Sequence, residues 1–167
     1  MKKSNYETNT GHRFISETNT AYKIHIHCPD DSVLHMSVGY LKCGKSKGLR
    51  KAVALRNRHG FDMWGKYWKI VLRQPEVFTR LPHSLEPKVI HKPRPTKLEP
   101  DRTKPYYIAK WVVYGEGTKK TRSVLASIDR YGKLAAYSKA KKALMNANKH
   151  NLGILSYMGR VGILDLK

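Results

Sequence analysis

Acidic residues are scarce in this sequence. Only 12 of its 167 residues are Asp or Glu, against 33 Lys and Arg, which leaves a formal net charge of +21 at pH 7. In a compact chain such an excess repels itself unless a polyanion balances it, so nucleic acid is the expected partner. An anionic membrane surface or a ribosomal RNA would also fit the charge taken alone.

Cysteines are few, and long apolar runs are missing. Cys28 and Cys43 are the only cysteines, which fits a reducing compartment and excludes a disulfide framework. No stretch reaches the ~18 apolar residues of a membrane span, and the polar start lacks the apolar segment of a signal peptide. We therefore expect a cytoplasmic, nucleoid-associated protein that uses no membrane.

Signatures of catalysis and of metal binding are also missing. There is no His-Asn-His site, no GIY…YIG pair and no spaced acidic pair except the adjacent Asp30 and Asp31, which indicate a turn. One alternative is a zinc site that mixes imidazoles and thiols, made from His25, His27, Cys28, His35 and Cys43. Against it, the sequence has no Cys-x-x-Cys pair, and Cys28 would point away from His25 and His27 on a strand. We expect no enzyme, no cofactor and no metal.

Proline is concentrated in one basic segment. Seven of the eight prolines lie between residues 75 and 105, and proline removes the backbone donor that helices and sheets need. This predicts a linker over 74–105 between a first module, 1–73, and a second module, 106–167. A linker of about 30 residues spans about 30 Å as a coil and up to about 90 Å if it is polyproline-like, so DNA half-sites about 34 Å apart are accessible.

The two halves share one order of predicted elements. Alternating stretches at 22–27 and 34–38 predict a hairpin, followed by a helix after a break at 44–48 and before a stop at Gly60. Stretches at 107–114 and 122–129 predict a second hairpin, and a helix follows over about 134–149. The sequence of Trp64–Tyr67 also resembles that of Met158–Val161. We infer two tandem copies of one module, about 60 to 70 residues each.

Alternation along the strands assigns their two faces. The residues expected in the core are Ile24, Ile26, Leu34, Met36 and Val38 in the first copy, and Ala109, Trp111, Val113, Val124, Ala126 and Ile128 in the second. The residues expected to face outward are Lys23, His25, His27, His35 and Ser37 in the first copy, and Lys110, Ser123 and Ser127 in the second.

An exposed face of this kind fits the major groove of double-stranded DNA, where strand side chains meet base edges and flanking cations meet phosphates. The phosphate candidates lie in basic turns: Lys42, Lys45 and Lys47 in the first copy, and Lys119, Lys120 and Arg122 in the second. Arg13, near a first strand around residues 14 and 15, is a further candidate. Trp64, Tyr67, Trp68, Tyr106 and Tyr107 are expected to pack in the core, and stacking on single-stranded bases is the alternative.

The stretches 10–15, 22–27 and 36–41, and the helix that carries Ala52 and Arg56, together resemble an AP2-like DNA-binding module. Such modules occur in homing endonucleases of phages and bacteria and in plant ethylene-response factors. The resemblance implies an α+β fold in which a three-stranded antiparallel sheet lies in the major groove with one helix across its back. By position, the family's base-reading residues fall on Arg13, Lys23, His25, His35, Lys110 and Ser127.

The second copy looks like the same module with its opening strand weak or missing, and the chain has no segment left for a nuclease head. We therefore expect a sequence-specific duplex DNA-binding protein: a transcriptional regulator that acts as a repressor, from a phage, a satellite or another mobile element. A homodimer is left open. The alternatives are an RNA-binding or ribosome-associated protein, and an accessory DNA-binding remnant of a homing endonuclease or recombinase.

Overall fold

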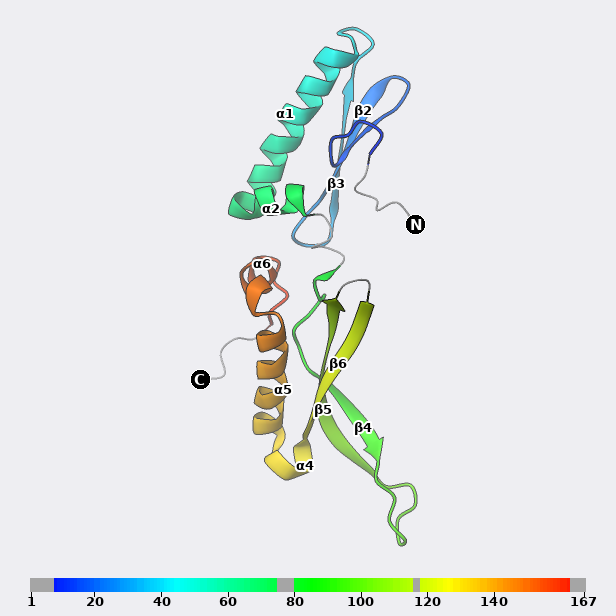
Figure 1. Cartoon of the computed structure of the whole chain (residues 1–167), viewed down its shortest axis with the longest axis vertical. Helices are drawn as coiled ribbons and strands as arrows, with labels where there is room; N and C mark the ends of the chain where they lie inside the picture. The colour runs from blue at the N-terminus through cyan, green and yellow to red at the C-terminus, as the bar shows by residue number, and fades with distance from the viewer. Residues whose placement is uncertain (1–7, 75–79, 116–117, 163–167) are drawn as a thin grey trace. The chain divides into compact units, whose positions relative to one another are not determined.

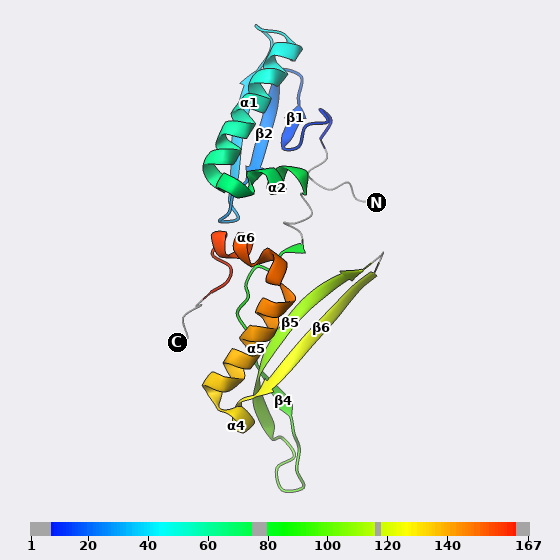
Figure 2. The same ribbon diagram turned by 60° about the vertical axis from the view of Figure 1, so that its left-hand side comes forward.

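The computed structural model divides the chain into two units, Met1–Leu81 and Pro82–Lys167 (Figures 1 and 2). It describes residues 8–74, 80–115 and 118–162. Each unit contains one three-stranded antiparallel sheet and several helices, which confirms an α+β fold of two small modules. Within the described ranges, no helix is both long enough and apolar enough to cross a membrane.

Unit 1 is a β-β-β-α module. Its strands β1 (Ile15–Glu17), β2 (Ala21–His27) and β3 (Val33–Gly39) pair in chain order. They are followed by the long helix α1 (Lys45–Trp64), the 3-10 turn η1 (Gly65–Tyr67) and the short helix α2 (Trp68–Arg73). Helix α1 lies along the sheet (Figure 2) and buries one residue in every four: Gly48, Ala52, Arg56, Gly60 and Trp64. Ile24 and Ile26 of β2 are fully buried, as the alternation predicts.

Gly60 does not end α1, so the prediction of a helix stop there is wrong. It lies inside the helix, where an added Cβ would stand 2.3 Å from Cε2 of Trp68. Gly48 is not part of a break either, because α1 begins at Lys45, and a Cβ on Gly48 would stand 2.5 Å from the Cβ of Tyr40. Both glycines allow a neighbouring element to pack closely against the helix.

Unit 2 repeats this order of elements. Its strands are β4 (Lys88–Pro93), β5 (Thr103–Gly115) and β6 (Thr118–Ser127), followed by the short helix α4 (Ile128–Tyr131) and the long helix α5 (Lys133–Ala147). The 3-10 turn η2 (Lys149–Asn151) and the short helix α6 (Leu152–Tyr157) complete it. By element order η1 corresponds to η2 and α2 to α6. The sequence match between Trp64–Tyr67 and Met158–Val161 therefore joins segments that are not equivalent, because the second follows α6.

The segment predicted to be a linker contains the opening strand of unit 2. Pro93 is the last residue of β4, which is an edge strand, and edge strands tolerate proline. Pro105 lies outside the part of β5 that pairs with β6, so its missing N–H removes no hydrogen bond from that ladder. The second copy thus has its first strand, and the expectation that this strand is missing is wrong.

Residues 82–87 also belong to unit 2. The Leu85 N–H donates to the Arg160 carbonyl at 2.9 Å, and Nη1 of Arg160 donates to the Pro82 carbonyl at 3.2 Å. Eight residues, 74–81, separate the end of α2 at Arg73 from Pro82, and even fully extended a segment of this length spans about 28 Å. The prediction of a linker of about 30 residues is therefore wrong, and so is the span calculated from it.

The cores follow the predicted parity only where a helix covers the sheet. In unit 2, Ala109 and Ala126 are buried, Trp111, Val124 and Ile128 are half-buried, and Val113 is 39% exposed. The ribbon of β5 and β6 diverges from α5 towards its tip in Figure 2, so the inward side there stays open. In unit 1, Leu34, Met36 and Val38 are half-buried because β3 is an edge strand.

Candidate nucleic-acid interface

The outer face of sheet 1 is the side of β1, β2 and β3 that points away from α1. Two cross-strand rows of polar residues occupy it: Lys23 pairs with Ser16 on one side and Ser37 on the other, and His25 pairs with His35. The two imidazole rings meet edge to face, with centroids 4.6 Å apart. Lys23, His25, His35 and Ser37 are all exposed, and no helix in the described part of the chain covers them.

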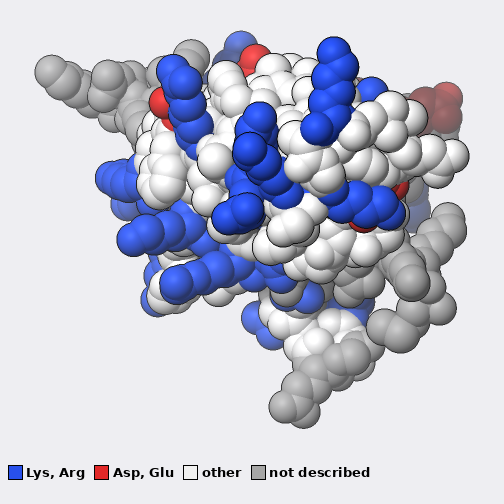
Figure 3. All heavy atoms as spheres, turned by 90° about the horizontal axis from the view of Figure 1, so that it is seen from above, with Lys and Arg blue, Asp and Glu red and all other residues white. Residues whose placement is uncertain are grey.

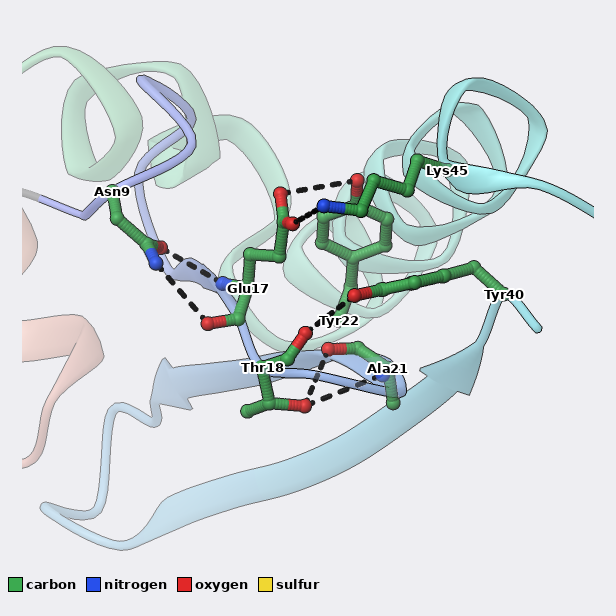
Figure 4. Close-up of polar contacts among 7 residues, drawn as sticks. All are labelled: Asn9, Glu17, Thr18, Ala21, Tyr22, Tyr40 and Lys45. Carbon is green, nitrogen blue, oxygen red and sulfur yellow. Dashed lines mark hydrogen bonds and ion pairs between the residues drawn. The ribbon is translucent and has the colours of Figure 1, made fainter.

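A hollow of about 520 Å³ opens on this face. Its lining comes from the segment before β1 and from all three strands: Thr8, Asn9, Phe14, Ser16, His25, His27, Val33 and His35. The Asn9 side chain exchanges two hydrogen bonds with the backbone of Glu17, at 2.8 and 3.1 Å, and so holds its segment beside β1 (Figure 4). Phe14 has a left-handed backbone (φ 65°), and its buried ring stacks on Trp68, 5.9 Å away. The hollow is therefore held in place by the core.

The histidines of the face lose proton affinity in the fold. The His25 side chain is exposed but partly desolvated by its neighbours, which lowers its pKa below the ordinary 6.5, and nearby His35 and Lys23 lower it further. Burial also lowers the pKa of His27, with a smaller opposing effect from Asp31. At pH 7 both rings are neutral, and a neutral imidazole offers one donor and one acceptor.

Mild acid is expected to lower the melting temperature of unit 1. Because the pKa values of His25 and His27 lie below 6.5 in the fold, the unfolded chain takes up protons first as the pH falls. The stability linked to their neutral form is complete above 6.5 and is lost as the pH falls through the folded pKa values.

The emission of the buried Trp64 and Trp68 reports this transition in thermal melts between about pH 7.5 and 5.5. The double variant H25N/H27N is expected to show a flatter pH dependence. Parallel curves for the variant and the parent protein would refute the assignment.

The lysines of the predicted basic turn at 42–47 are placed differently, because Lys45 and Lys47 lie in the first turn of α1 and only Lys42 precedes the helix. Lys42 and Lys47 are exposed. Lys45 donates to Glu17 at 2.6 Å and lies over the Tyr40 ring, and its hydrogen bond with Glu17 raises its pKa (Figure 4). Seen from the end where β3 turns into α1, Lys and Arg side chains project from the surface among few carboxylates (Figure 3). Lys42 and Lys47 thus remain candidates for phosphate contact, whereas Lys45 already has an anionic partner.

Arg13 is engaged inside unit 1. Its Nη1 donates to the Leu72 carbonyl of α2 at 2.7 Å, and its own carbonyl accepts from Nη1 of Arg56 at 3.0 Å. Arg56 is buried, and that burial lowers its pKa. The helical spacing from Ala52 placed Arg56 on the predicted helix, but its burial and its hydrogen bond to the Arg13 carbonyl were not predicted. We therefore leave Arg13 out of the interface.

The residues predicted in the second copy do not share one face. Lys110 and Lys119 lie on the side of sheet 2 away from α5, and both are exposed. Lys120 and Arg122 pair with Val113 and Trp111, so they lie on the opposite side. Ser127 is half-buried, and its Oγ accepts the Arg130 N–H at 3.3 Å as the N-cap of α4, which gives it a structural role.

No protein-family model, curated protein or solved structure matches this chain. The AP2-like relationship therefore stays a prediction, and the case for an interface rests on the geometry and charge of the two sheets. Among the described residues, His, Cys, Asp and Glu side chains do not gather in any group of three or more that could hold a metal ion. Cys28 instead contacts Met63, with 3.2 Å between the sulfur atoms.

Proposed function

We propose that this protein is a non-enzymatic, sequence-specific binder of duplex DNA that acts as a transcriptional repressor by occupying a promoter. The observation that carries the proposal is the outer face of sheet 1, where Lys23, His25, His35 and Ser37 stand in two rows on the side that α1 leaves open. The major groove of B-DNA, about 12 Å wide, admits a ribbon of strands presented in this way.

The chemistry of the face suits the reading of base edges. A lysine can donate to O6 and N7 of guanine, and a neutral imidazole or a serine hydroxyl can donate to or accept from several bases. The exposed Lys42 and Lys47 lie outside the two rows and are suited to phosphate contacts. The net charge of +21 supplies a sequence-independent attraction that added salt weakens.

The short connection constrains how both units could act on one duplex. Because residues 74–81 reach at most about 28 Å, unit 2 stays close to any duplex that unit 1 binds. Tethering then raises the affinity of the second contact through a high local concentration.

Lys23→Ala is expected to weaken binding to the preferred duplex about tenfold, since one good base contact contributes about 1–3 kcal/mol. The preferred duplex is first selected from random sequences at about 150 mM salt, where weak surface electrostatics are screened. Lys51→Ala is the matched control. Lys51 is exposed on α1, so this substitution removes the same charge at a place outside the outer face of sheet 1. Both variants should bind unselected DNA equally.

The proposal fails if no preferred motif is enriched, or if the two variants lose the same affinity for the selected duplex. Competition with a structured RNA tests the second candidate. If such an RNA displaces the duplex at equal concentration, the protein is an RNA-binding or ribosome-associated protein.

A further inference from the structure

The outer face of sheet 2 is the side of β4, β5 and β6 that points away from α5. The opposite side holds the buried Tyr107, Ala109 and Ala126, and the Tyr107 ring meets Tyr137 of α5 edge to face, with centroids 5.5 Å apart. The strand register places six large apolar or aromatic residues on the outer face: Ile90, Tyr106, Ile108, Val112, Tyr114 and Leu125. They form rows across the strands, such as Ile90 beside Tyr106 and Ile108 beside Leu125.

This surface is open to solvent. Val112 and Leu125 are each 37% exposed and Tyr114 is 41% exposed, while the other three residues are half-buried. At the corresponding place, sheet 1 carries histidines, serine and lysine. The two sheets therefore share a topology but present different chemistry.

The charged strand residues on the outer face of sheet 2 are all lysines. Lysines surround the apolar rows at positions 88, 92, 104, 110 and 119, and none of the described strand residues on this face is Asp or Glu. Of these lysines, Lys104 has an ion pair, with Asp129 of α4 at 3.6 Å. Pairing of this face with a second copy of itself would bring lysines against lysines, which is unfavourable. The occupant is therefore expected to be anionic and to have apolar surface of its own.

The chemistry favours unpaired bases over a duplex. Val112, Ile108 and Leu125 cannot hydrogen-bond to base edges in a groove, and the hydroxyl side chains of β6 are short. A single strand instead exposes the faces of its bases, which stack on aromatic and apolar side chains, while lysines meet its phosphates. A duplex could not stack on these aromatic and apolar side chains, because its base faces are covered by neighbouring base pairs.

A hollow of about 350 Å³ adjoins these rows. It lies beside the start of β4 at Lys88, where β5 continues without a β4 partner, and it is lined by Ile108, Lys110 and Val112 of the outer face together with Trp111, Glu86 and Leu144. This volume is at the lower end of the range for ligand pockets and is large enough for one planar base. Polar and apolar groups both line it, as base recognition requires.

We propose that the outer face of sheet 2 binds unpaired nucleotides of a single nucleic-acid strand. Bases lie on Tyr106, Val112, Tyr114 and Leu125, one base enters the hollow beside Lys110, and the surrounding lysines contact the phosphates. This activity is separate from duplex binding by sheet 1, so either proposal can fail while the other stands.

The test uses the full chain and fluorescence anisotropy with labelled oligonucleotides of about 15 nucleotides, which exceeds the site size of many single-strand binding modules. The probes are oligo(dT), oligo(U), the selected duplex and a polyglutamate peptide. Val112→Ser and Tyr114→Ala are expected to weaken binding to a single strand, Tyr114→Ala by about tenfold, since stacking of one base contributes on that order. Val113→Ser is the matched control, because Val113 is 39% exposed on the other side of the same strand.

The expected result is that Val112→Ser and Tyr114→Ala weaken single-strand binding, Val113→Ser does not, and Lys23→Ala alone weakens duplex binding. Equal losses for Val112→Ser and Val113→Ser would overturn the proposal. It would also be overturned if polyglutamate displaced oligo(dT) and bound with the same dependence on Val112 and Tyr114, because the face would then be a docking site for an acidic protein.

Discussion

Replacing Gly60 with alanine is expected to destabilise unit 1 by about 2–3 kcal/mol, although alanine is normally the better helix former by about 1 kcal/mol. The added Cβ would stand 2.3 to 2.5 Å from three atoms of the Trp68 ring, which is 1% exposed and stacks on Phe14. A ring held in this way has no free space to move into, so α1 and α2 must separate. For a unit of this size the melting temperature should fall by roughly 10–20 °C.

Ala54→Gly on the exposed side of α1 provides the comparison. It is expected to cost about 1 kcal/mol, the ordinary propensity difference without a clash. The second comparison is Gly60→Ala in a Trp68→Leu background, where a smaller side chain relieves the overlap and the added methyl group should cost much less. Urea unfolding followed by tryptophan emission measures all five proteins: the parent, the three single variants and the Gly60→Ala/Trp68→Leu double variant. A Gly60→Ala protein as stable as the parent would show that the close packing of the helix on Trp68 is wrong.

Glu86→Ala is expected to destabilise unit 2 by about 2 kcal/mol, whereas Lys141→Met should change its stability by less than about 1 kcal/mol. Nζ of Lys141, whose side chain is 8% exposed, donates to Glu86 at 2.5 Å and also to the Val161 carbonyl. Removing the carboxylate leaves a buried ammonium group without its counter-charge. The expected loss is smaller than the 3–5 kcal/mol typical of breaking a fully buried ion pair, because Glu86 is 39% exposed to solvent.

Lys141→Met leaves fewer polar groups without a partner than Glu86→Ala does. Without Lys141, the partly solvated Glu86 still accepts a hydrogen bond from the Tyr137 hydroxyl at 2.6 Å. Burial and this bond raise the pKa of Tyr137 to about 12, so the hydroxyl keeps its proton and remains a donor. The double variant E86A/K141M should recover most of the loss, because no unpaired charge remains. Hydrogen exchange of α5 in the full chain measures these differences, and equal losses for the two single variants would contradict the prediction.

Much of unit 1 was predictable because its pattern is local. Alternation alone places Ile24 and Ile26 in the core and Lys23 and His25 on the open face, since successive side chains of a strand point to opposite sides. The α5 helix was predicted for a similar reason: its apolar residues recur at a helical spacing. The composition also gave the excess of positive charge on which the expectation of a polyanionic partner depends.

Predictions from the sequence were wrong where the conformation of a segment depends on contacts with residues far away in the chain. Lys88–Pro93 lies within the proline-rich stretch 75–105, and its two adjacent β-branched residues, Val89 and Ile90, are too short a signal to distinguish a strand from a linker. It becomes a strand because β5 supplies its hydrogen bonds. The sequence around Gly60 predicts a helix stop. The structure shows instead that the Trp68 ring occupies the space where a side chain on residue 60 would lie.

The sequence by itself therefore determined the charge, the α+β class, the central strands and the polar face of sheet 1. The tertiary structure alone decided that sheet 2 has a third strand, that Arg13 and Ser127 serve internal hydrogen bonds, and that the second outer face is apolar and cationic. The physical reason is that periodicity reports which side of its own element a residue occupies. Whether another element covers that side depends on pairing and packing between segments far apart in the chain.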